Sequence, residues 1–241
     1  MYASVRYIAR GIALAMAAAC ITAEAARAQW SATAVGVAEY DTNETLLLLA
    51  GVSVSPFGGP GISPVFGIQV YRLSYETVSG TTEVWSVRPS AGIRNNFDGG
   101  SAQFRVGYAF TSRDVPTPIA GGVGDRRDGV VISSQVDWWG TGGPLGAQAI
   151  ASYNFGSSSL WARGRLTTRL TSTERGQVRV GGEVAFLNDD DFTMVQPGAV
   201  IEWHTRPQGP ILALGVGRKL NDPGEDATYF KLEVVLPLLR P

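Results

Sequence analysis

The chain has 241 residues, of which 44% are hydrophobic and 17% charged, with a formal net charge of −1 and a single cysteine. This charge balance gives no reason to expect a nucleic-acid partner. One thiol supplies neither an internal disulfide nor a set of thiolate metal ligands, so a disulfide-stapled fold is excluded as well.

The N-terminal segment is typical of a secretory signal peptide. Arg6 and Arg10 form a basic start, residues 11–21 are a short apolar stretch, and Ala26-Arg27-Ala28 is a small-x-small cleavage site. The apolar stretch is too short for a helix that spans a hydrocarbon core of roughly 30 Å. The segment is therefore expected to direct export.

Two alternatives remain open at this end of the chain. The segment could be an amphipathic helix that the mature protein keeps. It could also be a lipoprotein signal ending at Ala19-Cys20 with Cys20 acylated, although Ala17 stands where a lipobox prefers leucine. We predict cleavage before Gln29, so that residues 1–28 form a signal peptide and residues 29–241 form one domain.

The predicted mature chain has no cysteine. Removal of residues 1–28 leaves 17 basic and 20 acidic residues. A small exported protein without disulfides needs another source of stability, and a closed ladder of backbone hydrogen bonds supplies one. No remaining segment reaches the roughly 18 consecutive apolar residues of a transmembrane helix, so any membrane insertion has to use strands.

Residues 29–241 read as a series of strands whose side chains alternate between apolar and polar. In the clearest run, residues 102–111, Phe104, Val106 and Tyr108 share one face, and Gln103 and Arg105 share the other. Strand side chains point to alternate faces, so such a strand separates an apolar surface from a polar one. The predicted strands lie near residues 30–40, 44–55, 64–76, 82–95, 101–112, 128–139, 145–155, 159–171, 177–187, 192–205, 210–220 and 227–238.

These strands predict an all-β fold, an antiparallel up-and-down transmembrane β-barrel of about 12 strands (10–12). An even strand number places both termini on the periplasmic side, so connections from odd to even strands lie outside the cell. The longest connection, residues 113–127, then falls outside, as is usual for such barrels. The connection at residues 56–63 is longer than this scheme favours for an inner turn.

One face of the predicted strands is almost entirely apolar. Aromatic residues near strand ends, among them Trp138 and Trp203, suit the level of the lipid headgroups. The alternative is a water-soluble sandwich or lipocalin-like barrel with this face packed inward. The residues assigned to lipid are Trp85, Val87, Ala91, Ile93, Leu160, Ala162, Leu166, Leu170, Val178, Val180, Val184, Phe186, Phe230, Leu232, Val234, Leu236 and Leu238.

The opposite face would line the lumen and carries an excess of arginine. The planar guanidinium fork suits carboxylate and phosphate groups. One interpretation is a pore that favours anions through its charged lining; the other is a salt-bridged network that fills and closes the lumen. The predicted lumen-lining residues are Arg88, Arg94, Arg105, Asp137, Arg163, Arg165, Arg169, Arg179, Glu183, Glu202, Lys231 and Glu233.

Signals for catalysis and metal binding are weak. His204 is the single histidine and a weak catalytic candidate, since no local motif supplies a serine within reach. Gly-x-Ser-x-Gly and His-Glu-x-x-His motifs are missing from the sequence. Residues 121–127 resemble a phosphate-binding loop only superficially. No cofactor is expected.

Many carboxylates fall on or beside the predicted outer connections. They either keep exposed loops soluble or coordinate divalent ions that bridge lipopolysaccharide phosphates. Asp189, Asp190 and Asp191 are weak metal candidates, because they lack the spacing of an EF-hand loop. The carboxylates concerned are Asp41, Glu44, Glu76, Asp114, Asp125, Asp128, Asp189, Asp190, Asp191, Asp222, Glu225 and Asp226.

Across residues 29–241 the chain resembles small bacterial outer-membrane β-barrel proteins. The cleavage site, the alternating strands and the final run, residues 229–238, carry this resemblance. The last strand is interrupted by Pro237, and residues 238–241 follow it in place of the terminal aromatic residue that many such proteins have. The resemblance implies a location in the outer membrane, with lipopolysaccharide and the barrel-assembly machinery as partners.

Three functions remain open. The leading expectation is a barrel that passes or binds a small anionic solute without enzymatic activity. The second is a closed structural or surface-interaction barrel that acts through its outer loops, and the third is an outer-membrane hydrolase centred on His204.

Overall fold

The computed structural model describes residues 30–77, 80–114, 125–139, 143–189, 192–205, 209–222 and 224–239, which form strands and no helix. No helix in these ranges is both long and apolar enough to cross a membrane. The predicted signal peptide lies outside the described residues. The strands are β1 (Ser31–Asp41), β2 (Leu46–Ser55), β3 (Gly61–Thr77), β4 (Gly80–Phe97), β5 (Gly100–Asp114), the two-residue β6 (Asp125–Arg126), β7 (Gly129–Trp138), β8 (Leu145–Asn154), β9 (Ser159–Thr173), β10 (Gly176–Asn188), β11 (Thr193–His204), β12 (Ile211–Asp222) and β13 (Ala227–Leu239).

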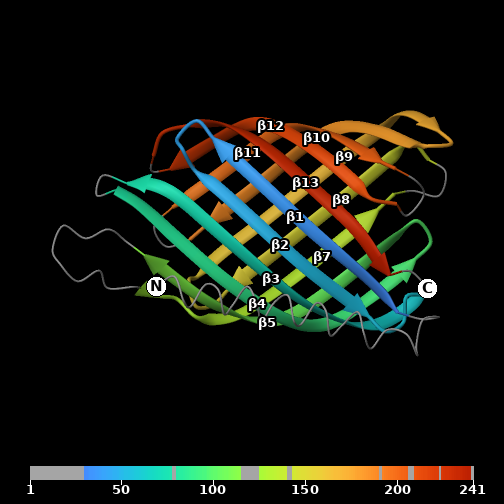
Figure 1. Ribbon diagram of the computed structural model, residues 1–241, viewed down its shortest axis with the longest axis horizontal. Coiled ribbons are helices and arrows are strands. Elements are labelled where there is room, and N and C mark those ends of the chain that lie inside the picture. The colour runs from blue at the N-terminus through green and yellow to red at the C-terminus, as the bar shows by residue number, and fades with distance from the viewer. Residues whose placement is uncertain are drawn as a thin grey trace.

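Twelve of these strands close into one antiparallel barrel. Each long strand pairs with its neighbour in sequence, β4 pairs with both β3 and β5, and β1 lies between β2 and β13. The first and last strands therefore seal the cylinder (Figure 1). β6 only extends the edge of β5, where Ser112 pairs with Arg126. The predicted fold class is confirmed, and closure leaves no unpaired sheet edge within the barrel.

The alternation of side chains and the turn residues explain why the chain folds this way. In β5, Phe104 and Phe110 point outward, whereas Gln103 and Arg105 point into the barrel. β4 and β5 are joined by the two residues Asp98 and Gly99, and Gly99 has a φ of 75°. A two-residue hairpin turn of this kind needs positive φ, which glycine adopts without strain.

The strand ends follow the predicted runs closely, with two differences. β3 begins at Gly61, so the inner connection before it is shorter than the sequence suggested. β13 continues through Pro237, which pairs with Thr33 beside a shift of register at Ala32 and Thr33. A bulge absorbs a proline that cannot donate to the ladder, so the interruption at Pro237 is a local irregularity and the strand continues to Leu239.

The strand directions define two ends of the barrel. β1 begins and β13 ends at the same end, on the right of Figure 1, and the connection from β1 to β2, the end of β3 and the start of β4 lie at the opposite end. We call these the inner and outer ends. Most of the long predicted outer connection, residues 115–124, lies outside the described residues.

The exterior of the barrel is an apolar band. Leu170, Phe230 and Leu166 are 68%, 60% and 57% exposed, although all three are large hydrophobic side chains. Water-soluble monomers rarely expose a continuous apolar surface of this extent. In transmembrane barrels, such a band faces the hydrocarbon of the lipid bilayer, where apolar side chains are not exposed to water.

Replacing Leu166 with arginine should destabilise the folded barrel in lipid by about 2 kcal/mol, because a cation near the middle of the apolar band faces hydrocarbon. The measurement is the urea concentration at which refolded protein in vesicles unfolds. Thr168→Arg is the matched control, because it lies on the same strand nearer the inner end. Equal urea midpoints for the two variants would contradict the membrane placement.

Candidate functional site: the lumen

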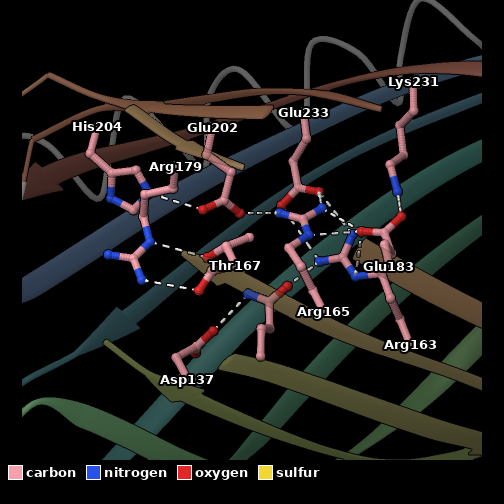
Figure 2. A network of polar contacts seen from close by, with 11 residues as sticks. Asp137, Arg163, Arg165, Thr167, Arg179, Glu183, Glu202, His204, Lys231 and Glu233 are labelled. Atoms are coloured by element: carbon pink, nitrogen blue, oxygen red, sulfur yellow. Dashed lines mark hydrogen bonds and ion pairs between the residues drawn. The ribbon is translucent and has the colours of Figure 1, made fainter. Parts of the chain in front are cut away.

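The centre of the lumen holds a buried cluster of ion pairs. Arg165 donates from Nη2 to Glu183 Oε2 at 2.6 Å and to Glu233 Oε2 at 2.8 Å, and from Nη1 to Glu202 Oε1 at 2.8 Å. Arg163 donates from Nη1 to Glu233 Oε2 at 2.8 Å. The cluster joins strands that are not neighbours, since Arg163 and Arg165 are on β9 and Glu233 is on β13 (Figure 2). These side chains cross the interior of the barrel and link parts of the wall that are not adjacent.

The cluster continues on both sides. Lys231 contacts the second oxygen of Glu183, and His204 Nε2 donates to Glu202 Oε2 at 3.1 Å. The His204 ring stands edge-on to Trp139 with centroids 5.2 Å apart. Arg179 lies over the same Trp139 ring, 5.6 Å from its centroid. The inner end of this side of the lumen is therefore covered by packed side chains.

A second buried ion cluster lies near the outer end. Lys219 Nζ donates to Glu39 Oε1 at 2.8 Å and to Asp41 Oδ2 at 2.7 Å. Gln196 donates to the other Glu39 oxygen at 2.8 Å. Asp41 Oδ1 also accepts from the backbone N–H groups of residues 43 and 45, which fixes the turn after β1.

Asp41 lies beside an outer connection, as the sequence predicts, at the end of β1. Its side chain, however, is 2% exposed and points into the barrel, so it is not an exposed rim carboxylate. Glu39 and Lys219 were not predicted as lumen residues. The signal that could have found Glu39 and Asp41 is the parity of β1, where they share a face with Val35 and Val37.

The two clusters define what we call the paired side of the lumen, formed by β9 to β13 and β1. Its cations are Arg163, Arg165, Lys219 and Lys231, and its carboxylates are Glu39, Asp41, Glu183, Glu202 and Glu233; all are buried. Taking charges out of water is expensive unless each is paired and hydrogen-bonded. Here the pairing is extensive, so these four cations present no free positive charge to a solute.

The opposite wall carries arginines of a different kind. We call Arg88, Arg94 and Arg105, on β4 and β5, the arginine wall. Their side chains are half-exposed, whereas Arg163 and Arg165 are 8% and 6% exposed. The arginine wall is therefore accessible from the space inside the barrel.

The hydrogen-bond partners of the arginine wall are neutral. Arg88 Nη2 donates to the Tyr71 hydroxyl at 3.1 Å, and Arg94 Nη2 donates to Ser101 Oγ at 3.1 Å. Arg105 Nη2 donates to Gln103 Oε1 at 2.7 Å. Within the part of the chain that the structure describes, no carboxylate forms an ion pair with these three. A guanidinium has five N–H donors, so this wall keeps both positive charge and spare donors.

A belt of amide side chains joins the two sides of the lumen. Gln103 donates to Gln135 at 2.8 Å, and Gln135 donates to Asp137 Oδ2 at 2.7 Å. Gln148 donates to Asp137 Oδ1 at 2.6 Å and accepts from Arg163. Asp137, a predicted lumen residue, is therefore held by two amides, and the belt fixes the side chains that border the arginine wall.

Two further predicted residues lie at the edge of the lumen. Arg169 is exposed near the inner end of β9, beside a shift of register between β9 and β10. Arg179 is 1% exposed and donates from Nε to Thr167 Oγ1 at 3.1 Å and from Nη2 to the Pro144 carbonyl at 3.0 Å. Both arginines lie near the inner end of the barrel, away from the middle of the lumen.

The weak candidates for metal binding and catalysis have little local support. Asp189 follows β10, and its two neighbours Asp190 and Asp191 lie outside the described residues. No group of three or more potential metal ligands occurs in the described ranges. His204 is 7% exposed and hydrogen-bonds Glu202 at the inner end of the lumen. It is built into the ion-pair cluster through this contact.

No protein-family model matches the sequence, and no curated protein sequence matches it. Among solved structures, an outer membrane channel from Pseudomonas putida F1 aligns with a TM-score of 0.55 and 12% identity, over 87% of this chain and 96% of that chain. The beta domain of the Bordetella autotransporter BrkA aligns with a TM-score of 0.48 and 13% identity, over 86% and 98%. The translocator domain of the autotransporter NalP from Neisseria meningitidis aligns with a TM-score of 0.49 and 13% identity, over 97% of each chain. At 12% identity, the likeness to the Pseudomonas putida channel shows a shared barrel fold alone.

Proposed function

We propose that the chain is a bacterial outer-membrane β-barrel that passes or binds small anionic solutes along the arginine wall of its lumen. The observation that carries this proposal is the sorting of charge between the two sides of the interior. Cations on the paired side are compensated by buried carboxylates. Those on the arginine wall have neutral partners and accessible surface.

The positions of the three arginines suit a path rather than a single site. Arg105 lies on β5 opposite Gly92 of β4. Measured along β4, the three arginines therefore stand at the heights of residues 88, 92 and 94. With a rise of about 3.3 Å per residue, the levels span roughly 20 Å along the strand. A solute oxygen could pass from one guanidinium to the next, and each would bind it through charge-assisted hydrogen bonds. Lining charges of one sign are how pores select ions.

The test is the reversal potential of the refolded protein in planar bilayers under a potassium chloride gradient. We expect chloride to be favoured. We expect Arg88→Gln combined with Arg105→Gln to lower the chloride-to-potassium permeability ratio at least about fivefold, because each of the two charges removed contributes about 1 kcal/mol at about 4 Å in water. Arg72→Gln is the matched control: Arg72 points outward and pairs with Glu83 at 2.5 Å outside the lumen.

A closed barrel that acts through its outer loops is the second candidate. The paired side favours it, because buried ion pairs and the packing of Trp139, His204 and Arg179 occupy much of the inner end. The same bilayer experiment separates the two candidates. Absence of conductance from folded protein would rule out passage of anions, and a preference for potassium would rule out the role of the arginine wall.

A further inference from the structure

The interior contains an apolar surface that the proposed path for anions does not use. Val35 and Val37 on β1, Leu47 and Leu49 on β2 and Leu73 on β3 are all half-exposed. We call these five residues the apolar strip. Exposed apolar surface is informative when it is contiguous, because it is costly in water and marks a binding surface.

Strand parity places the apolar strip inside the barrel. On β1, Val35 and Val37 share a face with Glu39, which contacts Lys219 in the lumen, and the alternate residue Tyr40 is 51% exposed to the outside. On β2, Leu48 is 39% exposed, so its neighbours Leu47 and Leu49 point inward.

On β3, Leu73 shares the face of Tyr71, whose hydroxyl accepts a hydrogen bond from Arg88 of the arginine wall. The outward residue Arg72 lies against Trp85. Leu73 therefore belongs to the inner surface.

The five residues are contiguous across three strands. Val37 is opposite Leu49, and Leu47 is opposite Leu73. On the other side of β1, Val35 is opposite Val235, which is half-exposed as well. Cross-strand neighbours on one face have side chains about 5 Å apart, so these residues form one patch rather than isolated positions.

The patch borders the arginine wall directly. Leu49 is opposite Tyr71, and the Arg88 guanidinium lies 4.6 Å from the centre of the Tyr71 ring. Arg105 reaches the same strand from the other direction: its Nη1 lies 2.7 Å from the position that a Cβ on Gly67 would take. Two guanidiniums thus lie over β3, beside a surface of valine and leucine side chains.

We infer that the lumen accepts amphipathic carboxylates. The carboxylate would bind the Arg88 guanidinium, and the apolar tail would lie along the apolar strip. This inference rests on the proposed passage of anions. The charge requirement follows from the arginine wall, since the carboxylates near the outer end of the strip are already paired with Lys219. A cation with the same tail would meet the Arg88 guanidinium beside the strip, whereas the lumen carboxylate Asp137 lies on β7 and is held by two amides. A short anion without a tail would leave the strip in contact with water.

The test compares three probes on the refolded full chain in planar bilayers: hexanoate, acetate and hexylammonium. The readout is the probe concentration that halves the chloride current. We expect this concentration to be about tenfold lower for hexanoate than for acetate, because its four extra methylene groups are partly removed from water on the strip. Hexylammonium should leave the current unchanged.

Two variants locate the effect. Val37→Thr combined with Leu49→Gln keeps the side-chain sizes and should abolish the advantage of hexanoate over acetate. Val200→Thr makes a matched change on the paired side, where Val200 is 4% exposed, and should keep the advantage. If the strip variant loses chloride selectivity as well, the effect belongs to the whole lumen and the assignment to the strip is wrong.

The outcomes separate this inference from the proposed function. Equal half-blocking concentrations for hexanoate and acetate, with chloride still favoured, would overturn the inference and leave the anion path standing. Block by hexylammonium would show an apolar site without charge selection and would also overturn it.

For a barrel that carries no current, a binding readout replaces the electrical one. A ligand that binds the folded state raises the temperature at which the folded form disappears. Hexanoate should raise this temperature on an unboiled gel, and acetate and hexylammonium should not. No shift with hexanoate would overturn the inference independently of conductance.

Discussion

Replacing Arg165 with methionine is expected to destabilise the folded barrel by roughly 3 to 5 kcal/mol, because removing one partner from a buried ion cluster leaves uncompensated charge. Arg165 is hydrogen-bonded to Glu183, Glu202 and Glu233 at once. Methionine has a similar length but supplies no donor. The three carboxylates would then repel each other in a space that excludes water.

The measurement is urea unfolding in vesicles, followed by the difference in gel mobility between folded and heated protein. Arg105→Met is the control, since the guanidinium donates to the neutral Gln103 and the side chain is half-exposed. Converting Glu183 to glutamine in the Arg165→Met background should recover part of the loss, because one negative charge is then removed. Equal urea midpoints for Arg165→Met and Arg105→Met would show that the cluster does not stabilise the fold.

The second large effect is expected from Gly217→Ala on β12. A Cβ at this position would lie 2.1 Å from the carbonyl oxygen of Pro197 and 2.7 Å from Cε1 of the Tyr229 ring. The carbonyl belongs to the neighbouring strand and cannot move without breaking the ladder. The loss should be roughly 3 kcal/mol or more, since overpacking of this kind forces backbone shifts.

The Tyr229 ring explains why this region needs glycine on two strands. The ring is fully buried, and its hydroxyl lies 2.1 Å from the position of a Cβ on Gly198, which is opposite Gly217. Gly36→Ala on β1 is the control, because a Cβ there meets nothing within 4 Å. The fraction of refolded protein that migrates as the folded form should fall for Gly217→Ala and stay unchanged for Gly36→Ala. Normal refolding of both would contradict the packing.

The twelve long strands could be predicted because each one obeys a local rule. Alternation with period two and turns such as Asp98-Gly99 act over a few residues, and no distant contact has to be known. The sequence predicts the start of the third strand at residue 64, three residues after the actual start of β3 at Gly61, and this difference has a local cause as well. Its first residues sit among Gly and Pro, which weaken the strand pattern, but pairing with β4 at Asn96 orders them.

The grouping of charges inside the barrel could not be predicted in the same way. Parity placed Arg105 and Arg165 on the same kind of surface, but one is half-exposed beside an amide and the other is buried among three carboxylates. The difference depends on β9 and β13 facing one another across the interior. Strand tilt and register after closure set that relation, and neither is encoded in a single strand.

β13 is the last long strand to be made, and its pairing with β1 completes the cylinder. It carries Lys231 and Glu233, the partners of charges on β9 and β10. The same seam brings Glu39 and Asp41 of β1 to Lys219 of β12. Because buried charges are costly until they are paired, we expect closure of the barrel and pairing of these three side chains to occur together during assembly.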